Sequence, residues 1–173
     1  MLSAIVLASD SRTLSAQPDA VVRTLSALVP AAIEGLVRDV TLAGLMGGDL
    51  GHIADHAGCI LVESADPETV LRGALEASRG QKLFVIRAGR APDAGYIDEI
   101  ADFLSAYQAA TCCALMRERP QTFLARTFPA LAPAAGLVAG RDMLMRSGGS
   151  SLEALVRQMR PAVTLRARAR KVD

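Results

Sequence analysis

Two arginines and a glycine stand where an apolar segment of the chain ends. Residues 83–86 predict a buried strand, and Arg87, Gly89 and Arg90 follow it in a sharp turn. Ligands of open α/β sheets bind beyond the carboxyl ends of the strands, and guanidinium groups bind anions through charge and paired N–H donors. Arg87 and Arg90 are therefore candidates for anion binding. The other interpretation, which the sequence leaves open, is that both are ordinary solvated loop residues.

The elements that would position this turn alternate along the chain. Apolar runs predict strands at 3–8, 37–43, 59–62 and 83–86, and helices are expected to start near 18, 49 and 66. This alternation is typical of an α/β fold with a doubly wound, mostly parallel sheet flanked by helices. In the first helix, Pro30 is expected to disturb the helical path. Its apolar stripe is expected to contain Val22, Leu25, Leu28 and Val29.

The last third of the chain follows a different pattern. A helix is expected at 96–106 and another at 151–159. Two short apolar runs, 111–116 and 135–139, would add strands at the sheet edge, in antiparallel sense. Residues 1–160 are expected to form one domain, and residues 161–173 a basic C-terminal tail.

The charge and composition of the chain indicate a globular domain and restrict its possible partners. The chain has 173 residues, of which 51% are hydrophobic and 21% charged, as in a globular domain. Six basic residues and no acid lie between Arg157 and Lys171. This basic end is expected either to be solvated and partly frayed or to attach weakly to anionic lipid. Aromatic residues make up only 3% of the chain, so few rings are available to stack on bases, and nucleic acid is not expected as a partner.

The cysteines and the first residues of the chain indicate the cellular compartment. Cys59, Cys112 and Cys113 form an odd set without a disulfide spacing, which indicates reduced thiols in a cytoplasm. The start of the chain lacks the basic region of a signal peptide, and no apolar run approaches the ~20 residues that cross a bilayer. We therefore expect a cytoplasmic protein, with peripheral contact to the inner face of the membrane left open.

The order of these segments resembles family 2 glycosyltransferases of the GT-A fold. The opening strand, the second strand and the glycine-containing loop after it match the family layout, as do the stretch before the fourth strand, the helix start after the turn and the late Gly-Gly. These segments are residues 2–8, 37–43, 44–49, 77–81, 91–100, 136–141 and 147–149. The resemblance spans about residues 2–160. It implies a nucleotide-sugar fold, with a nucleoside diphosphate or nucleotide sugar as the ligand.

Several positions depart from the family pattern. The family acids that bind the nucleobase, bind the divalent ion and act as general base correspond here to Gly44, Gly89 and Ala134. Glycine and alanine can neither ligate an ion nor accept a proton, so the resemblance implies that the divalent metal site is lost. No cofactor is then expected. The family arginine on the diphosphate side falls near Pro67, and Arg72 lies one turn further.

The segment after the second predicted strand also contains residue types that can bind a metal ion. Asp49, His52, His56 and Cys59 include zinc-ligand types at helical spacing. However, the apolar residues of that helix are expected to take its buried face, so a solvated polar face is the preferred interpretation. The glycines at 44, 47 and 48 do not follow a dinucleotide-binding order.

Two functions therefore remain open. The first is a diverged, glycosyltransferase-like protein whose canonical activity is weak or absent and, where present, independent of metal. The second is a non-catalytic binding or assembly module that self-associates or pairs with a true transferase. If a nucleotide sugar binds, the residues expected around it are Ala8, Asp10, Gly44, Arg72, Arg87, Gly89 and Arg90.

Overall fold

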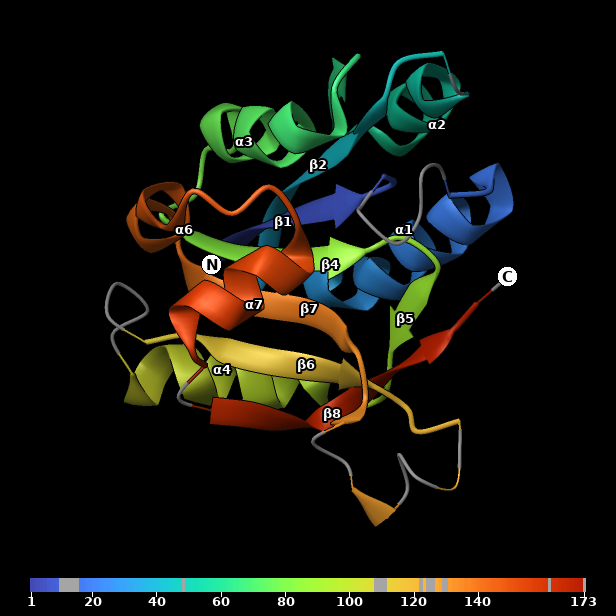
Figure 1. The fold of residues 1–173 in the computed structure, drawn as a ribbon. Helices are drawn as coiled ribbons and strands as arrows, with labels where there is room; N and C mark the ends of the chain where they lie inside the picture. Colours follow the sequence, from blue (N-terminus) through green and yellow to red (C-terminus); the bar gives the residue numbers. More distant parts are fainter. Residues whose placement is uncertain are drawn as a thin grey trace.

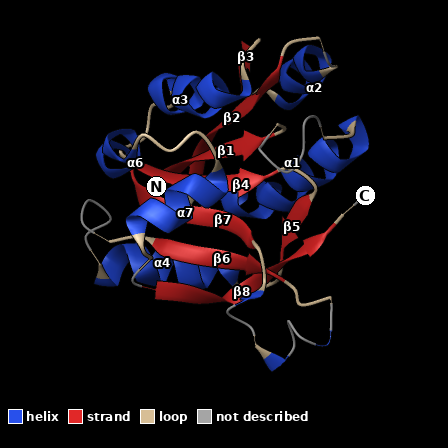
Figure 2. Cartoon of the chain, in the orientation of Figure 1, coloured by secondary structure: helices blue, strands red, loops and turns tan. Residues whose placement is uncertain are grey.

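The computed structural model describes residues 1–9, 16–47, 49–107, 112–121, 123, 127–128, 131–161 and 163–172. Helices and strands alternate through the first half of the chain (Figures 1 and 2). The strands are β1 (Leu2–Leu7), β2 (Val37–Leu45), β3 (Ile60–Ser64), β4 (Lys82–Arg87), β5 (Arg90–Pro92), β6 (Ala114–Glu118), β7 (Ala134–Gly140) and β8 (Val163–Lys171). The helices are α1 (Pro18–Ile33), α2 (Leu50–Ala57), α3 (Pro67–Ala77), α4 (Tyr96–Ala106), α6 (Arg141–Ser147) and α7 (Leu152–Met159).

Within the described residues, the strands form one eight-stranded sheet in the order β3-β2-β1-β4-β7-β6-β8-β5. The pairs β3–β2, β2–β1 and β1–β4 are parallel, as predicted. Strand β7 is antiparallel to both β4 and β6. The expected antiparallel sense is therefore confirmed for β7, whereas β6 runs in the same direction as β4. The place of these late strands is not the sheet edge, however, because β7 lies between β4 and β6.

Two hydrophobic clusters sandwich the sheet. Helices α1, α2 and α4 bury their apolar side chains on one face, and α3, α6 and α7 bury theirs on the other. The strands β1, β4 and β7 have almost wholly buried side chains because helices cover both of their faces. Among the described residues, no helix is both long enough and apolar enough to span a bilayer.

Helix α1 differs from its prediction in two ways. It continues through Pro30, because Pro30 lies on the solvent side and the carbonyl of Ser26 that loses its helical partner is also on an exposed residue. The buried face is rotated from the predicted stripe, so Val22 and Val29 are 45% and 51% exposed. Leu25 and Leu28 are buried as expected.

The predicted starts of three other helices can be compared with the structure. The Asp66 carboxylate accepts a hydrogen bond from the Glu68 N–H at the start of α3, as its sequence indicates. Ser151 caps α7 in the same way. Asp49 precedes α2, but its side chain makes no capping hydrogen bond.

The basic C-terminal segment is a strand rather than a frayed tail. Residues 163–171 form β8, which runs parallel to β6 and antiparallel to β5. Leu165 and Ala169 are buried in the hydrophobic cluster that also contains side chains of α4, while the arginines between them point elsewhere. This alternation of apolar and basic residues is a strand pattern. The expectation of a partly frayed end is therefore wrong, although Arg166, Arg170 and Lys171 are exposed.

Candidate functional site

The carboxyl ends of three neighbouring strands meet at one edge of the sheet. Ala8 follows β1, and its N–H donates to the Ala43 carbonyl of β2 at 2.7 Å. On the other side of β1, the N–H of Ala88, just after β4, donates to the Leu7 carbonyl at 2.9 Å. The structure therefore brings Ala8, Gly44 and the turn after β4 to a common edge, as the sequence predicted.

The β1–β2 end of this edge is tightly filled. Gly44 packs against Ala8, the Ser9 hydroxyl and Leu50, so that an added Cβ atom would overlap the end of the Leu50 side chain. The Ser9 hydroxyl accepts a hydrogen bond from the Leu45 N–H at 2.9 Å. Ala8 is 1% exposed. Asp10, the other residue predicted near the base, lies outside the described residues.

The turn between β4 and β5 is held against α1. Gly89 adopts φ +75°, a conformation that favours glycine. Its N–H donates to the Thr24 hydroxyl at 2.9 Å, and the Arg90 N–H donates to the same hydroxyl at 3.2 Å. The Val172 N–H, just beyond β8, donates to the Gly89 carbonyl at 3.0 Å. Gly89 is buried, so the turn is covered by α1 and the end of β8.

Arg87 forms a buried ion-pair network with two acids from distant parts of the chain. Its guanidinium bonds the Glu153 carboxylate of α7 and lies 3.6 Å from Oε1 of Glu118, at the end of β6. Arg90 completes the network, with its Nε 2.7 Å from the same Glu118 oxygen. The Arg87 side chain is only 3% exposed. We call these four residues the Arg87 network.

Burial makes the Arg87 network energetically important. Charges removed from water are stable only when they are paired and hydrogen-bonded, and taking one partner from a buried pair costs about 3–5 kcal/mol. The formal charges of its two guanidinium groups and two carboxylates sum to zero. Arg87 and Arg90 are therefore not solvated loop residues, and that interpretation is wrong. They are also not freely open to a phosphate group, because carboxylates occupy their donors.

A second arginine pair lies beside the network. Arg117 on β6 is in register with Arg168 on β8, and the Arg117 Nη1 donates to the Ala132 carbonyl at 2.6 Å. Burial, and then the charge of Arg168, lower the pKa of Arg117. The Nη1 of Arg168 is buried and has no hydrogen-bond partner among the described residues. The carboxyl end of β6 therefore carries additional positive charge.

Arg72 lies on α3, which carries no residue of the Arg87 network. It lies on the exposed side of α3, where its Nε is 3.1 Å from the Glu76 carboxylate. It lines a polar cavity of about 350 Å³ between α3 and the segment that joins α6 to α7, which includes Gly148, Gly149 and Ser150. Its ion pair is thus with a residue outside the Arg87 network.

The acids of the Arg87 network were not anticipated. Glu118 and Glu153 are 28 residues from Arg90 and 66 residues from Arg87, respectively. No spacing rule connects residues at these separations. The available signals were weak: Glu118 lies two residues after an apolar run, and Glu153 lies in the first turn of a predicted helix.

Comparison with known proteins shows what this architecture is similar to. Glucosyl-3-phosphoglycerate synthase from Mycobacterium tuberculosis in complex with UDP aligns at a TM-score of 0.66 and 15% identity, over 94% of this chain and 69% of that chain. Its complex with Mn²⁺, UDP-glucose and phosphoglyceric acid aligns at 0.65 and 15%, over 95% and 68%. A further mycobacterial protein aligns at 0.62 and 18%, over 99% and 65%. This chain has the GT-A fold.

The likeness concerns the GT-A fold itself, because the identities are below 20%. No protein-family profile matches the chain, and no curated protein matches it. The fold class predicted from the order of the motifs is confirmed.

The side chains around the β4–β5 turn of this GT-A chain do not suit a divalent ion. Complexes of the synthase contain Mn²⁺ or Mg²⁺. Here Gly89 offers no side-chain donor, and the carboxylates of Glu118 and Glu153 are paired with guanidinium groups. Within the described part of the chain, no group of three His, Cys, Asp or Glu side chains could hold a metal ion.

Proposed function

We propose that this protein is a diverged, family 2-like GT-A protein that binds a nucleoside diphosphate or nucleotide sugar without a divalent metal. Its sugar transfer is weak or absent. The GT-A fold supports the ligand class, since structures of the similar synthase are complexes with UDP and UDP-glucose. The Arg87 network supports the metal independence, and it is the observation on which the proposal depends most.

The charge of the ligand explains the role of the arginines. A nucleoside diphosphate leaving group gains negative charge as the sugar bond breaks, and GT-A enzymes that use a metal offset this charge with the ion. Two unit charges ~4 Å apart interact by about 4 kcal/mol at an effective dielectric near 20. A guanidinium group could supply part of that stabilisation. We propose Arg87 and Arg90 for this role, and the positive charge of Arg117 and Arg168 at the end of β6 supports it.

Binding through these arginines has a cost. A diphosphate would have to compete with Glu118 and Glu153, whose carboxylates already occupy Arg87. We therefore propose weak affinity for the nucleotide. Ala134, at the position where the family places its general base, is buried and has no proton acceptor. Loss of a general base typically lowers a rate by 10²- to 10⁴-fold, which supports weak or absent transfer.

A non-catalytic assembly module is the second candidate. The exposed apolar side chains of Phe123, Phe128 and Leu131, between β6 and β7, favour it, with exposed fractions of 81%, 56% and 68%. These side chains would gain free energy by being covered in an oligomer or by a partner transferase. In this case the GT-A fold would serve as a scaffold without a ligand.

The cysteines and the basic strand bear on location. Cys59, Cys112 and Cys113 are not in disulfides, which supports the proposal of a reducing, cytoplasmic environment. Arg166, Arg170 and Lys171 on β8 are exposed. Peripheral contact with anionic lipid through this strand is part of the proposal, at about 1 kcal/mol per basic residue near the surface.

Titration calorimetry with UDP, GDP and UDP-glucose, each with and without Mn²⁺, distinguishes these candidates. Saturable binding of the same affinity in both conditions supports the metal-independent site. Binding that requires Mn²⁺ would overturn it. No binding of any nucleotide, together with concentration-dependent self-association in sedimentation, would favour the assembly module.

A further inference from the structure

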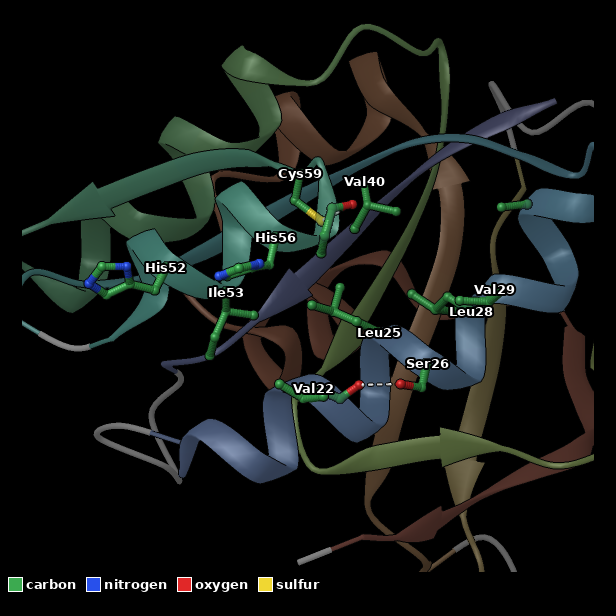
Figure 3. Close-up of a pocket in the computed structure, with 12 residues that line it drawn as sticks. Val22, Leu25, Ser26, Leu28, Val29, Val40, His52, Ile53, His56 and Cys59 are labelled. Carbon is green, nitrogen blue, oxygen red and sulfur yellow. Dashed lines mark hydrogen bonds between the residues drawn. The ribbon is translucent and has the colours of Figure 1, made fainter.

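A second cavity lies beside α1, and Arg87, Arg90, Glu118 and Glu153 are not among its lining residues. It has a volume of about 580 Å³ and is formed by α1, α2 and the adjoining part of β2 (Figure 3). The cavity is separate from the Arg87 network, and the function proposed above makes no use of it. Its volume falls in the range of small-molecule sites, about 300–1,000 Å³.

The wall of this cavity is mostly aliphatic. Leu25, Leu28 and Val29 contribute from α1, Val40 from β2 and Ile53 from α2. Figure 3 shows these side chains on the facing sides of the two helices and on the strand between them. Val29 is 51% exposed at the rim. Apolar surface that is left half-exposed in this way is stabilised when a ligand removes it from water.

The two imidazoles of the cavity lie on its α2 side. His52 and His56 project from successive turns of α2, and both are exposed. The Ser26 hydroxyl, on the α1 side, is already used, because it donates to the Val22 carbonyl at 2.9 Å (Figure 3). Among the residues that the structure describes, no Asp or Glu side chain lines the cavity. The imidazoles can donate hydrogen bonds, and no lining carboxylate would repel an anion that accepts them.

The size of the cavity argues for a small ligand rather than a protein partner. Twelve of the described residues line it. A stable protein–protein interface involves about 20–30 residues on each side. An alkyl chain matches the aliphatic wall, and a head group at the rim would lie beside the histidines and remain in contact with water.

We propose that the α1–α2 cavity binds a single-chain amphiphile. The alkyl chain lies among Leu25, Leu28, Val29, Val40 and Ile53, and an anionic head group accepts hydrogen bonds from His52 and His56. The head group is a carboxylate, as in a fatty acid, or a phosphate, as in an alkyl phosphate. Both head groups are anions that accept hydrogen bonds, which is the chemistry that the site recognises. This site does not depend on nucleotide binding elsewhere in the chain.

A single tryptophan reports on occupancy, because the chain contains none. Val22 lines the cavity and is 45% exposed, so Val22→Trp places the reporter at the mouth with little disturbance of the core. Titration of this variant with dodecanoate should shift the emission to shorter wavelength and saturate. Ile33→Trp is the matched control on the same helix: Ile33 is 81% exposed and lies outside the cavity lining, and its emission should not change. Val29→Trp is a second reporter if Val22→Trp does not fold.

Changes of head group and of the histidines complete the test. Dodecanol should bind at least about tenfold more weakly than dodecanoate, and the double variant His52→Ala/His56→Ala should remove that difference. Comparison of dodecanoate with dodecyl phosphate identifies the preferred head group. Absence of saturation, equal shifts of both reporters, or full affinity in the double variant would overturn the proposal. The proposal would also be overturned if Val22→Trp emits at shorter wavelength without ligand and moves to longer wavelength on dilution. A second copy of the chain would then cover the cavity.

Discussion

Arg90 and Glu118 connect two strands that are not neighbours in the sheet. The Nε of Arg90 lies 2.7 Å from Oε1 of Glu118, and β8 lies between β5 and β6, the strands that carry them. Because Glu118 also lies 3.6 Å from Arg87, this one carboxylate ties the turn after β4 to the end of β6. The stability of the edge should therefore depend strongly on the charges in this network.

Arg87→Ala should be strongly destabilising. It leaves Glu153 without its guanidinium partner, and loss of one partner from a buried pair costs about 3–5 kcal/mol. The expected value is near the lower limit, because Glu118 keeps Arg90. Arg72→Ala is the matched control, since it removes an exposed i,i+4 pair with Glu76 that is worth about 0.3–0.5 kcal/mol. Urea unfolding of both variants measures the difference, and equal losses would show that the Arg87 network contributes little to stability.

Glu153→Gln should strengthen UDP binding. The change removes a carboxylate that competes with the diphosphate for Arg87, while the Arg87–Glu118 contact remains. We expect affinity to rise about tenfold, or about 1.4 kcal/mol, with some loss of thermal stability. Glu63→Gln, on the exposed part of β3, is the control for the general change in net charge. Unchanged or weaker binding of UDP to Glu153→Gln would remove Arg87 from the proposed phosphate site.

Gly44→Ala should destabilise the protein by about 1–3 kcal/mol, the usual cost of overpacking a core. Its added methyl group would overlap the end of the Leu50 side chain, and Leu50 is itself buried. Combining it with Leu50→Ala should cost less than the sum of the two changes, because the second change makes room for the methyl group. Gly51→Ala is the comparison, since its methyl group would meet only Leu61 at 4.0 Å and should stabilise α2. Thermal unfolding of the four variants checks both expectations.

Tyr96 should make stability fall at high pH. Burial, and then the charge of Glu34, raise the pKa of Tyr96 from 10 to about 12, and its hydroxyl donates to the Ala27 carbonyl at 3.1 Å. The unfolded chain loses this proton near pH 10 while the folded chain keeps it. The contribution of the Tyr96 proton to the free energy of unfolding is therefore fully present below pH 10 and is lost as the pH rises to about 12. This loss amounts to up to about 3 kcal/mol. Tyr96→Phe should flatten the unfolding free energy over this window; an unchanged slope would exclude Tyr96 as its source.

The sequence predicted the parallel half of the sheet well, and the reason is physical. Strands β1 and β4 are covered on both faces, so each appears as a continuous apolar run bounded by turn residues. Strand β8 was missed because its arginines alternate with small apolar residues and resemble a solvated basic segment. Helix α6 was also missed, since it follows Gly140 directly and has no capping side chain.

The candidate site was predicted only in part. The carboxyl ends of β1, β2 and β4 are local features of the sequence, and they placed Ala8, Gly44 and Arg87 on a common edge. The partners of Arg87 are determined by the packing of α7 and β6 onto the sheet. That packing brings together residues far apart in sequence, so a single sequence cannot reveal which arginines will be neutralised.

The place of β8 in the sheet affects the order in which a nascent chain can fold. In the described structure β5 pairs with β8, and 70 residues separate Pro92 from Val163. Contacts across such intervals form late, because closing the intervening loop costs entropy. While the ribosome is still making that interval, the turn with Gly89 lacks both β8 and the hydrogen bond from Val172. A chain that stalls at this stage would expose Arg87 before Glu153, its carboxylate partner on α7, has been synthesised.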